Sequence, residues 1–171
     1  RDVFVLEGWW EAPEDRTDSA WTFHEADFGE AAAQMYAHDF DGDGDQDVVS
    51  SSAHDYGIWW HERIAPPEAD SSWATHLITD SFSQTHALLH RDVDEDGDPD
   101  LITGKRYFAH NGKDPGGTEP AVLYWLEYER GADGHSWIPH RIDSTSGIGV
   151  EFEYEHVIGD ERPDIVTANK H

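Results

Sequence analysis

Cysteine is absent from the 171-residue chain, which excludes disulfides, zinc–thiolate sites and thiol nucleophiles. Basic side chains are scarce: 11 lysines and arginines stand against 37 aspartates and glutamates, a formal net charge of −26. Such a surface repels phosphate backbones and anionic lipid, so neither nucleic-acid binding nor binding to an anionic membrane is expected. The chain also lacks any run of about 18 apolar residues, so no membrane insertion is expected.

Apolar residues nevertheless make up 37% of the chain and aromatic residues 12%. This content is sufficient for a packed core and separates the chain from disordered acidic tails. The length fits a single domain over residues 1–171. The first residues lack the charged-then-apolar pattern of a signal peptide.

Three sequence signatures recur in the same order along the chain. An aspartate followed by two apolar β-formers occurs at Asp2, Asp47, Asp100 and Asp164, with spacings of 45, 53 and 64 residues. The other two are Trp-x-x-His, at 21–24, 73–76 and 137–140, and paired aromatics, at 9–10, 59–60 and 124–125. The repeat periods are therefore about 2–46, 47–99 and 100–163, with a fourth beginning at 164–171.

Each period reads as about four short strands separated by turn residues, which is typical of a β-propeller blade. The predicted fold is therefore all-β, with about three four-stranded blades. Because closed propellers have four to eight blades, we expect the chain to be part of a larger propeller or to associate with another copy. Residues 29–35, rich in alanine, are predicted to form a turn at most, and residues 104–120 a loop insertion between two strands.

The strongest chemical motif is D-x-D-x-D-G-x-x-D, which occurs at 39–47 and again at 92–100. Alternating carboxylates in a tight loop converge on one point, and oxygen-only ligands favour Ca²⁺. The predicted ligands of the two sites are the side chains of Asp39, Asp41, Asp43 and Asp47, and of Asp92, Asp94, Asp96 and Asp100, with Asp45 and Asp98 contributing backbone carbonyls. Two Ca²⁺ sites are expected.

These loops are not EF-hands, because position twelve holds Ser50 or Thr103 instead of glutamate and both loops run into strands. A third loop near Asp160 and Asp164 is degenerate. It places His156 and Ile158 where the first two carboxylates belong, so no tight site is expected there.

The repeated acidic loops leading into short strands resemble the FG-GAP/VCBS repeats of integrin-α-like β-propellers. The resemblance implies a seven-bladed propeller with structural Ca²⁺ in its loops. Residues 50–61 and 104–112 resemble a bacterial branch of VCBS-repeat proteins that are often secreted, which implies a secreted or cell-envelope location.

Polar residues follow the Asp-led strands at matching places: His54, then Lys105 and Arg106, then Lys170 and His171. Equivalent positions of successive blades encircle one axis, so these groups are expected at one channel mouth, near His86, His110 and Tyr107. They either line a water-filled channel or bind a ligand. Each histidine of the Trp-x-x-His repeat is expected to pack beside its own tryptophan as a structural residue.

The expected function is a calcium-binding recognition module for carbohydrate or protein. Its other expected partners are the remaining blades or a second copy of the chain. The alternative is a sugar lyase, because the repeat is also similar to the propeller part of aldos-2-ulose dehydratases. The candidate catalytic residues would then be His54, His86, Lys105, Arg106 and His110.

Overall fold

The computed structural model describes residues 2–64, 72–131, 134–159 and 162–168. Within these ranges the chain is all-β apart from one short 3₁₀ element, η1 (Ala109–Gly112). None of the helical segments described has the length or the apolar character to cross a membrane. The strands are β1 (Val3–Val5), β2 (Gly8–Glu11), β3 (Thr22–Glu25), β4 (Ala32–His38), β5 (Asp47–Ser52), β6 (Tyr56–Arg63), β7 (Trp73–Ser83), β8 (Leu88–Arg91), β9 (Asp100–Lys105), β10 (Val122–Gly131), β11 (Gly134–Asp143), β12 (Phe152–Glu155) and β13 (Asp164–Thr167).

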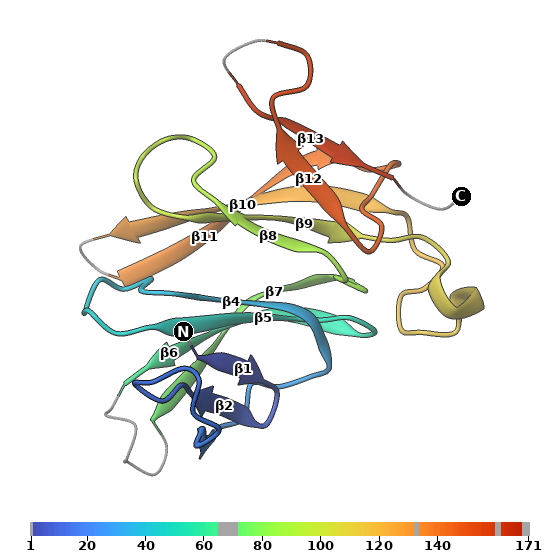
Figure 1. The fold of residues 1–171 in the computed structure, drawn as a ribbon. Helices are drawn as coiled ribbons and strands as arrows, with labels where there is room; N and C mark the ends of the chain where they lie inside the picture. Colours follow the sequence, from blue (N-terminus) through green and yellow to red (C-terminus); the bar gives the residue numbers. More distant parts are fainter. Residues whose placement is uncertain (1, 65–71, 132–133, 160–161, 169–171) are drawn as a thin grey trace.

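The strands form antiparallel sheets that are stacked like propeller blades (Figure 1). Two sheets are four-stranded, with orders β4-β5-β6-β7 and β8-β9-β10-β11. A three-stranded sheet, β1-β2-β3, lies before them and a two-stranded sheet, β12-β13, after them. This arrangement confirms the predicted fold class of partial propeller blades, and the described strands close no barrel.

The sequence periods are counted from the Asp-led strands, but each four-stranded sheet begins one strand before its Asp-led strand. In both four-stranded sheets the Asp-led strand, β5 or β9, is the second strand, and the strand ahead of the acidic loop is the first. By this count β1–β3 match the last three strands of a complete sheet, and β12 and β13 match its first two. The turn expected at residues 29–35 is wrong, because β4 (Ala32–His38) pairs with β5.

Apolar side chains from facing sheets make the core. The largest cluster lies between the two four-stranded sheets and contains Phe40, Val49, Ile58, Trp60, Phe82, Leu88, Leu101, Leu126 and Tyr128. A second cluster joins the β8–β11 sheet to β12 and β13 through Ala87, Ile102, Leu123 and Ile148. Burial of these surfaces, at roughly 25 cal/mol per Å², is the main attraction between the sheets.

A tryptophan, a glutamate and a histidine form the same unit in three sheets. The units are Trp9–Glu11–His24, Trp60–Glu62–His76 and Trp125–Glu127–His140. In each, the histidine lies opposite the tryptophan across an antiparallel pair, with ring centroids 4.1, 4.8 and 4.4 Å apart. The stacking partner is thus the tryptophan of the neighbouring strand, whereas the sequence interpretation paired each histidine with the tryptophan three residues earlier.

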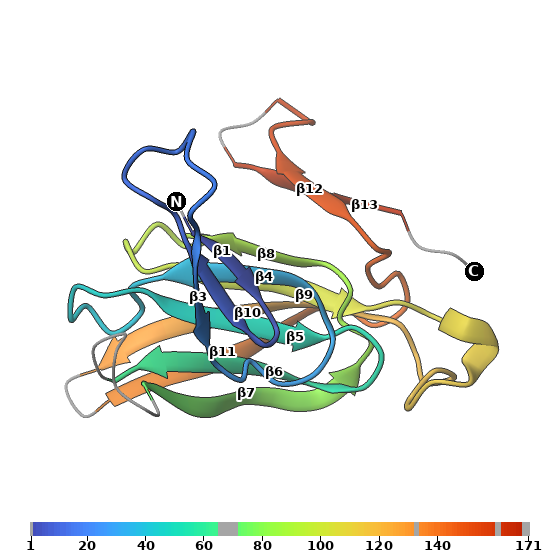
Figure 2. The same cartoon turned by 60° about the horizontal axis from the view of Figure 1, so that its bottom comes forward.

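The connections fall at two opposite ends of the stacked sheets. Figures 1 and 2 both show the β4–β5 and β8–β9 loops, which carry the two acidic motifs, at one end and η1 at the other. The end that carries η1 also holds the β5–β6 and β7–β8 connections, because strand direction alternates within each antiparallel sheet. Two candidate sites therefore lie at opposite ends of the molecule.

Candidate functional site

The two acidic loops, residues 39–47 and 92–100, share positive-φ positions and several hydrogen bonds. In the first, Asp39 Oδ2 accepts the Gly44 N–H at 3.1 Å and Asp41 Oδ1 accepts the Asp43 N–H at 3.0 Å. The second repeats both bonds 53 residues later, with Asp92 accepting from Gly97 and Asp94 from Asp96. Both loops adopt positive φ at their fourth and sixth positions, where the second loop uses Glu95 in place of the first loop's glycine.

Carboxylates converge within each loop. One ligand oxygen from each of Asp39, Asp41 and Asp43 lies within 4.8 Å of the others, and the same holds for Asp92, Asp94 and Asp100. Burial, together with neighbouring carboxylates, raises the pKa of Asp41 above its usual range. The Asp45 Oδ1 atom is buried with no hydrogen-bond partner among the described residues. A hard, oxygen-binding cation fits this set of carboxylate donors.

The last aspartate of each loop ties the loop to its sheet. Asp47 accepts the Phe40 N–H at 3.0 Å and the Arg63 N–H at 2.8 Å. Asp100 likewise accepts the Val93 and Tyr128 N–H groups, both at 2.9 Å. Both aspartates are almost fully buried, at 1% and 0% exposure. Each carboxylate is therefore a latch between the acidic loop and the third strand of its sheet.

The remaining predicted ligands and the degenerate loop are placed as follows. Asp96 accepts the Asp98 N–H, and the Asp98 carboxylate lies 3.3 Å from the Arg130 guanidinium. Asp164 accepts the Val157 and Ile158 N–H groups at 2.9 Å. Asp160, Lys170 and His171 lie outside the described residues.

At the opposite end, the insertion between β9 and β10 is held in place by hydrogen bonds within it and from the neighbouring sheet. The loop closes on itself through the Phe108 N–H and the Gly117 carbonyl, 3.1 Å apart. Tyr56 in β6 donates its hydroxyl to Glu119 at 2.8 Å, and Gln84 donates to the Pro115 carbonyl at 3.3 Å. Residues from the neighbouring sheet thus fix the position of the insertion.

Three of the predicted residues are brought together beside this insertion. The His54 ring lies 5.0 Å from the His86 ring and 4.7 Å from the His110 ring, centroid to centroid. His54 and His110 both direct Nδ1 at Asp114 Oδ2, at 3.3 and 2.8 Å. Although burial acts to raise it, the pKa of Asp114 is lowered overall by the hydrogen bonds from these two imidazoles.

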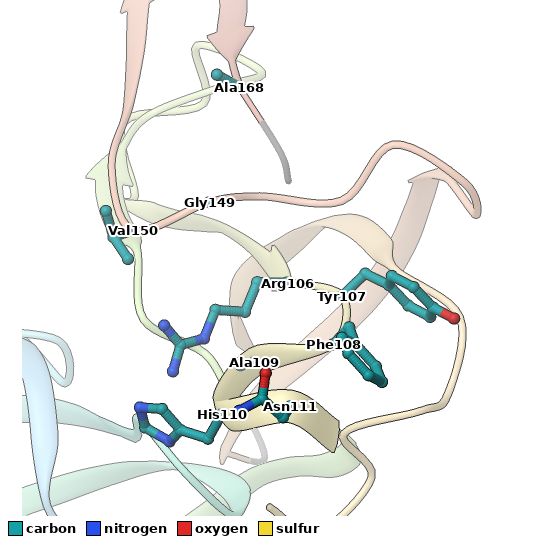
Figure 3. A pocket seen from close by; sticks show the side chains of 9 residues that line it. All are labelled: Arg106, Tyr107, Phe108, Ala109, His110, Asn111, Gly149, Val150 and Ala168. Atoms are coloured by element: carbon teal, nitrogen blue, oxygen red, sulfur yellow. The ribbon is translucent and has the colours of Figure 1, made fainter. Parts of the chain in front are cut away.

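A pocket of about 470 Å³ opens next to the histidines. Its lining combines polar groups with aromatic and aliphatic ones: Arg106, Tyr107, Phe108, Ala109, His110, Asn111, Gly149, Val150 and Ala168. Figure 3 shows the Arg106 guanidinium and the His110 imidazole on the same side of this pocket. Arg106 Nε and Nη2 are buried without a hydrogen-bond partner among the described residues, so the N–H groups of both nitrogens are available there.

His86 and Lys105 occupy different environments. Burial, with Arg106 and the other imidazoles nearby, lowers the pKa of His86 to about 4, so this ring is neutral at pH 7. Lys105 is 1% exposed, and its Nζ donates to the Glu119 carbonyl at 3.0 Å and to the Arg106 carbonyl at 3.3 Å. The ammonium group therefore anchors the insertion.

Sequence reasoning missed Asp114 and Arg130. Asp114 has one local signal, since it follows His110 by four residues within the insertion. Arg130 connects the two acidic loops: it pairs with Asp98 of the second, and a Cβ placed on Gly42 of the first would lie 2.5 Å from its Nη1. No repeat signature marks either residue.

Comparison with known proteins gave one family match. Residues 39–103 match the family model described as an FG-GAP-like repeat. No curated protein and no solved structure matched the chain. The matched segment begins at the first aspartate of the first acidic loop, ends within β9 and includes both acidic motifs. Together with the stacked four-stranded sheets, the match shows that residues 39–103 of this chain are an FG-GAP-like repeat, the β-propeller-type module that the sequence resembles.

Proposed function

We propose that this chain is a calcium-binding recognition module that binds a carbohydrate in the pocket beside η1. Ca²⁺ in the two acidic loops would be structural, holding one end of the stacked sheets. The pocket at the other end would bind the ligand. On the resemblance to secreted VCBS-repeat proteins, the proposed setting is secreted or at the cell envelope, where Ca²⁺ is abundant enough for extracellular-type sites.

The calcium proposal is supported by the duplicated loop geometry. Carboxylates that converge without a cation repel one another, and both loops bring three carboxylates together and repeat the same two hydrogen bonds. Asp39, Asp41 and Asp43 would hold the ion in the first loop, and Asp92, Asp94 and Asp100 in the second. The unpaired Asp45 Oδ1 offers a further oxygen donor in the first loop.

The composition of the pocket is the observation that carries the carbohydrate proposal. Phe108 is 49% exposed and Tyr107 40%, so both rings are accessible at the pocket. Aromatic faces match the apolar faces of sugar rings. Arg106, His110 and Asn111 supply polar groups for hydroxyls, and a volume of about 470 Å³ lies in the usual range for small-molecule pockets.

An array of neutral and uronate-containing oligosaccharides tests this proposal. We expect at least one oligosaccharide to be retained, and Phe108→Ala to weaken its binding about tenfold because a stacking surface is lost. Trp10→Ala is the matched control, since Trp10 is a 40% exposed aromatic in the distant β2 strand. Retention of no oligosaccharide, or equal binding by the Phe108→Ala variant, would overturn the proposal.

A second candidate function, elimination of water from a keto-sugar, is favoured by the neutral His86 beside Arg106 and two further imidazoles. A neutral imidazole accepts the proton α to the carbonyl, and the imidazolium so formed returns it to the β-hydroxyl, which leaves as water to give an unsaturated product. We expect wild-type turnover of a keto-sugar to be lost in His86→Gln while the Ca²⁺-dependent melting temperature stays the same. Absence of wild-type turnover excludes this function.

A further inference from the structure

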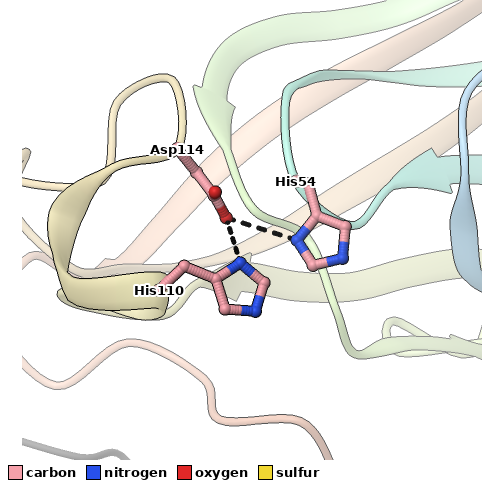
Figure 4. Close-up of side chains that lie close together, drawn as sticks. All are labelled: His54, His110 and Asp114. Carbon is pink, nitrogen blue, oxygen red and sulfur yellow. Dashed lines mark hydrogen bonds and ion pairs between the residues drawn. The ribbon is translucent and has the colours of Figure 1, made fainter.

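Two histidines and an aspartate from neighbouring sheets meet at one point near η1. His54 comes from the β5–β6 connection, and His110 and Asp114 come from the insertion between β9 and β10. One ligand atom from each residue lies within 4.8 Å of the other two. Figure 4 shows the Asp114 carboxylate directed at both imidazoles.

The distances from both imidazoles to the Asp114 carboxylate are close to those between ligand atoms of a single metal ion. Both Nδ1 atoms approach the same oxygen, Asp114 Oδ2, at 3.3 and 2.8 Å. Metal–ligand bonds of about 2.0–2.2 Å place neighbouring ligand atoms roughly 3 Å apart, so small adjustments would admit an ion between them. Two imidazoles and a carboxylate suit the borderline-soft divalent metals, whereas Ca²⁺ prefers oxygen alone.

The backbone at this point is held in an uncommon conformation. Phe108, His110 and Asn111 all have positive φ, at 53°, 48° and 61°, although none is glycine. Such conformations persist only where the surroundings enforce them, and they concentrate at functional sites. Here the Phe108–Gly117 bond and the contacts from Tyr56 and Gln84 hold the insertion that carries His110 and Asp114.

A fourth donor stands close by. The His86 ring lies 5.0 Å from that of His54, and its Nε2 is buried with no hydrogen-bond partner in the described ranges. The positive charge of Arg106 lies near the His86 ring and acts against the binding of a cation there. The negative charge of Asp114 offsets it in part. The three-residue set with a neighbouring imidazole is typical of sites for Zn²⁺ and related ions.

We propose that His54, His110 and Asp114 bind one divalent transition-metal ion of the Zn²⁺ class. The ion joins the two four-stranded sheets at the end opposite the acidic loops. This site is separate from the Ca²⁺ sites, and it shares His110 with the pocket proposed to bind carbohydrate. It adds a metal-dependent contact between the two sheets, and the residues that form this contact lie outside the repeated sequence signatures.

Calorimetric titration of the untagged, Ca²⁺-loaded chain with Zn²⁺ tests the proposal, with Co²⁺ as a spectroscopic probe. We expect one saturable Zn²⁺ site per chain, a visible Co²⁺ absorption band, and at least about 50-fold weaker binding in His110→Gln and Asp114→Asn. The matched control is His76→Gln, since His76 forms a 2.6 Å pair with Glu62 but belongs to no such cluster within the described part of the chain. It should bind Zn²⁺ as wild type does.

Two results would overturn the metal site. One is the lack of a saturable Zn²⁺ site in the wild-type chain. The other is Zn²⁺ binding of wild-type strength in both His110→Gln and Asp114→Asn, with their circular dichroism and Ca²⁺-dependent melting unchanged. Because His110 is an exposed loop residue, its replacement is expected to leave the fold intact.

Discussion

Chelation of Ca²⁺ is expected to lower the melting temperature of this chain by about 10–20 °C. At a free Ca²⁺ concentration of about 100 times Kd, each site stabilises the folded state by about 2.7 kcal/mol, and two sites by about 5 kcal/mol. In a domain of this size each kcal/mol corresponds to roughly 2–4 °C. Calorimetric scans in Ca²⁺ and in EDTA measure the shift directly.

Asparagine replacements in the loops separate bound calcium from a general effect of ionic strength. The double variant Asp41→Asn/Asp94→Asn should lose most of the Ca²⁺ response, because each loop loses a charged ligand. In EDTA, the same variant should be at least as stable as wild type, since carboxylate repulsion is relieved in both loops. Asp80→Asn, at an exposed aspartate outside the clusters, is the control and should respond as wild type does. Equal melting of wild type in Ca²⁺ and EDTA would contradict the calcium sites.

Replacing Asp100 by alanine is expected to reduce the free energy of unfolding by about 3–5 kcal/mol. The carboxylate is fully buried and accepts the N–H groups of Val93 and Tyr128. Each hydrogen bond to a charged group contributes about 1.5–3 kcal/mol, and the substitution leaves two donors without a partner. Urea unfolding at pH 7 measures the loss, and Asp100→Asn should lose less because one acceptor remains.

The role of Asp100 as a latch is distinguished from a role as a calcium ligand by repeating the measurement in EDTA. A latch predicts that most of the 3–5 kcal/mol loss persists without Ca²⁺. A loss that appears only with Ca²⁺ present would show that Asp100 acts mainly as a metal ligand and would contradict the latch. Asp80→Ala should change the free energy of unfolding by less than about 0.5 kcal/mol in either condition.

The acidic loops were predictable because their geometry is local. Alternating carboxylates accept N–H groups two and five residues ahead, and these bonds depend only on spacing and on the turns at the fourth and sixth positions. Because the motif is repeated, the loop geometry expected at residues 39–47 is also expected at residues 92–100. The same regularity predicted four-stranded sheets, since each period holds the same succession of strands.

Features that depend on strand pairing were not predictable. Residues 32–35 have helix-forming composition, yet pairing with β5 places them in β4, because hydrogen bonds along a sheet outweigh weak intrinsic propensity. Cross-strand register likewise decides that His24 stacks on Trp9.

The candidate site near η1 was only partly predictable. Equivalent positions in successive periods identified His54 and Arg106, and the structure places both at this end. Asp114 was missed because the insertion has no counterpart in the other periods, and because its partner His54 lies 60 residues away in the sequence. Lys105 was identified by the same equivalence, but its Nζ is bonded to the carbonyls of the insertion.

The most direct test of the account is the number of Ca²⁺ ions bound per chain, measured by calorimetric titration of the metal-free protein. The two acidic clusters predict two ions for wild type, and one ion for either Asp41→Asn or Asp94→Asn alone. Wild type that binds no Ca²⁺, or single variants that each still bind two ions with unchanged affinity, would contradict it.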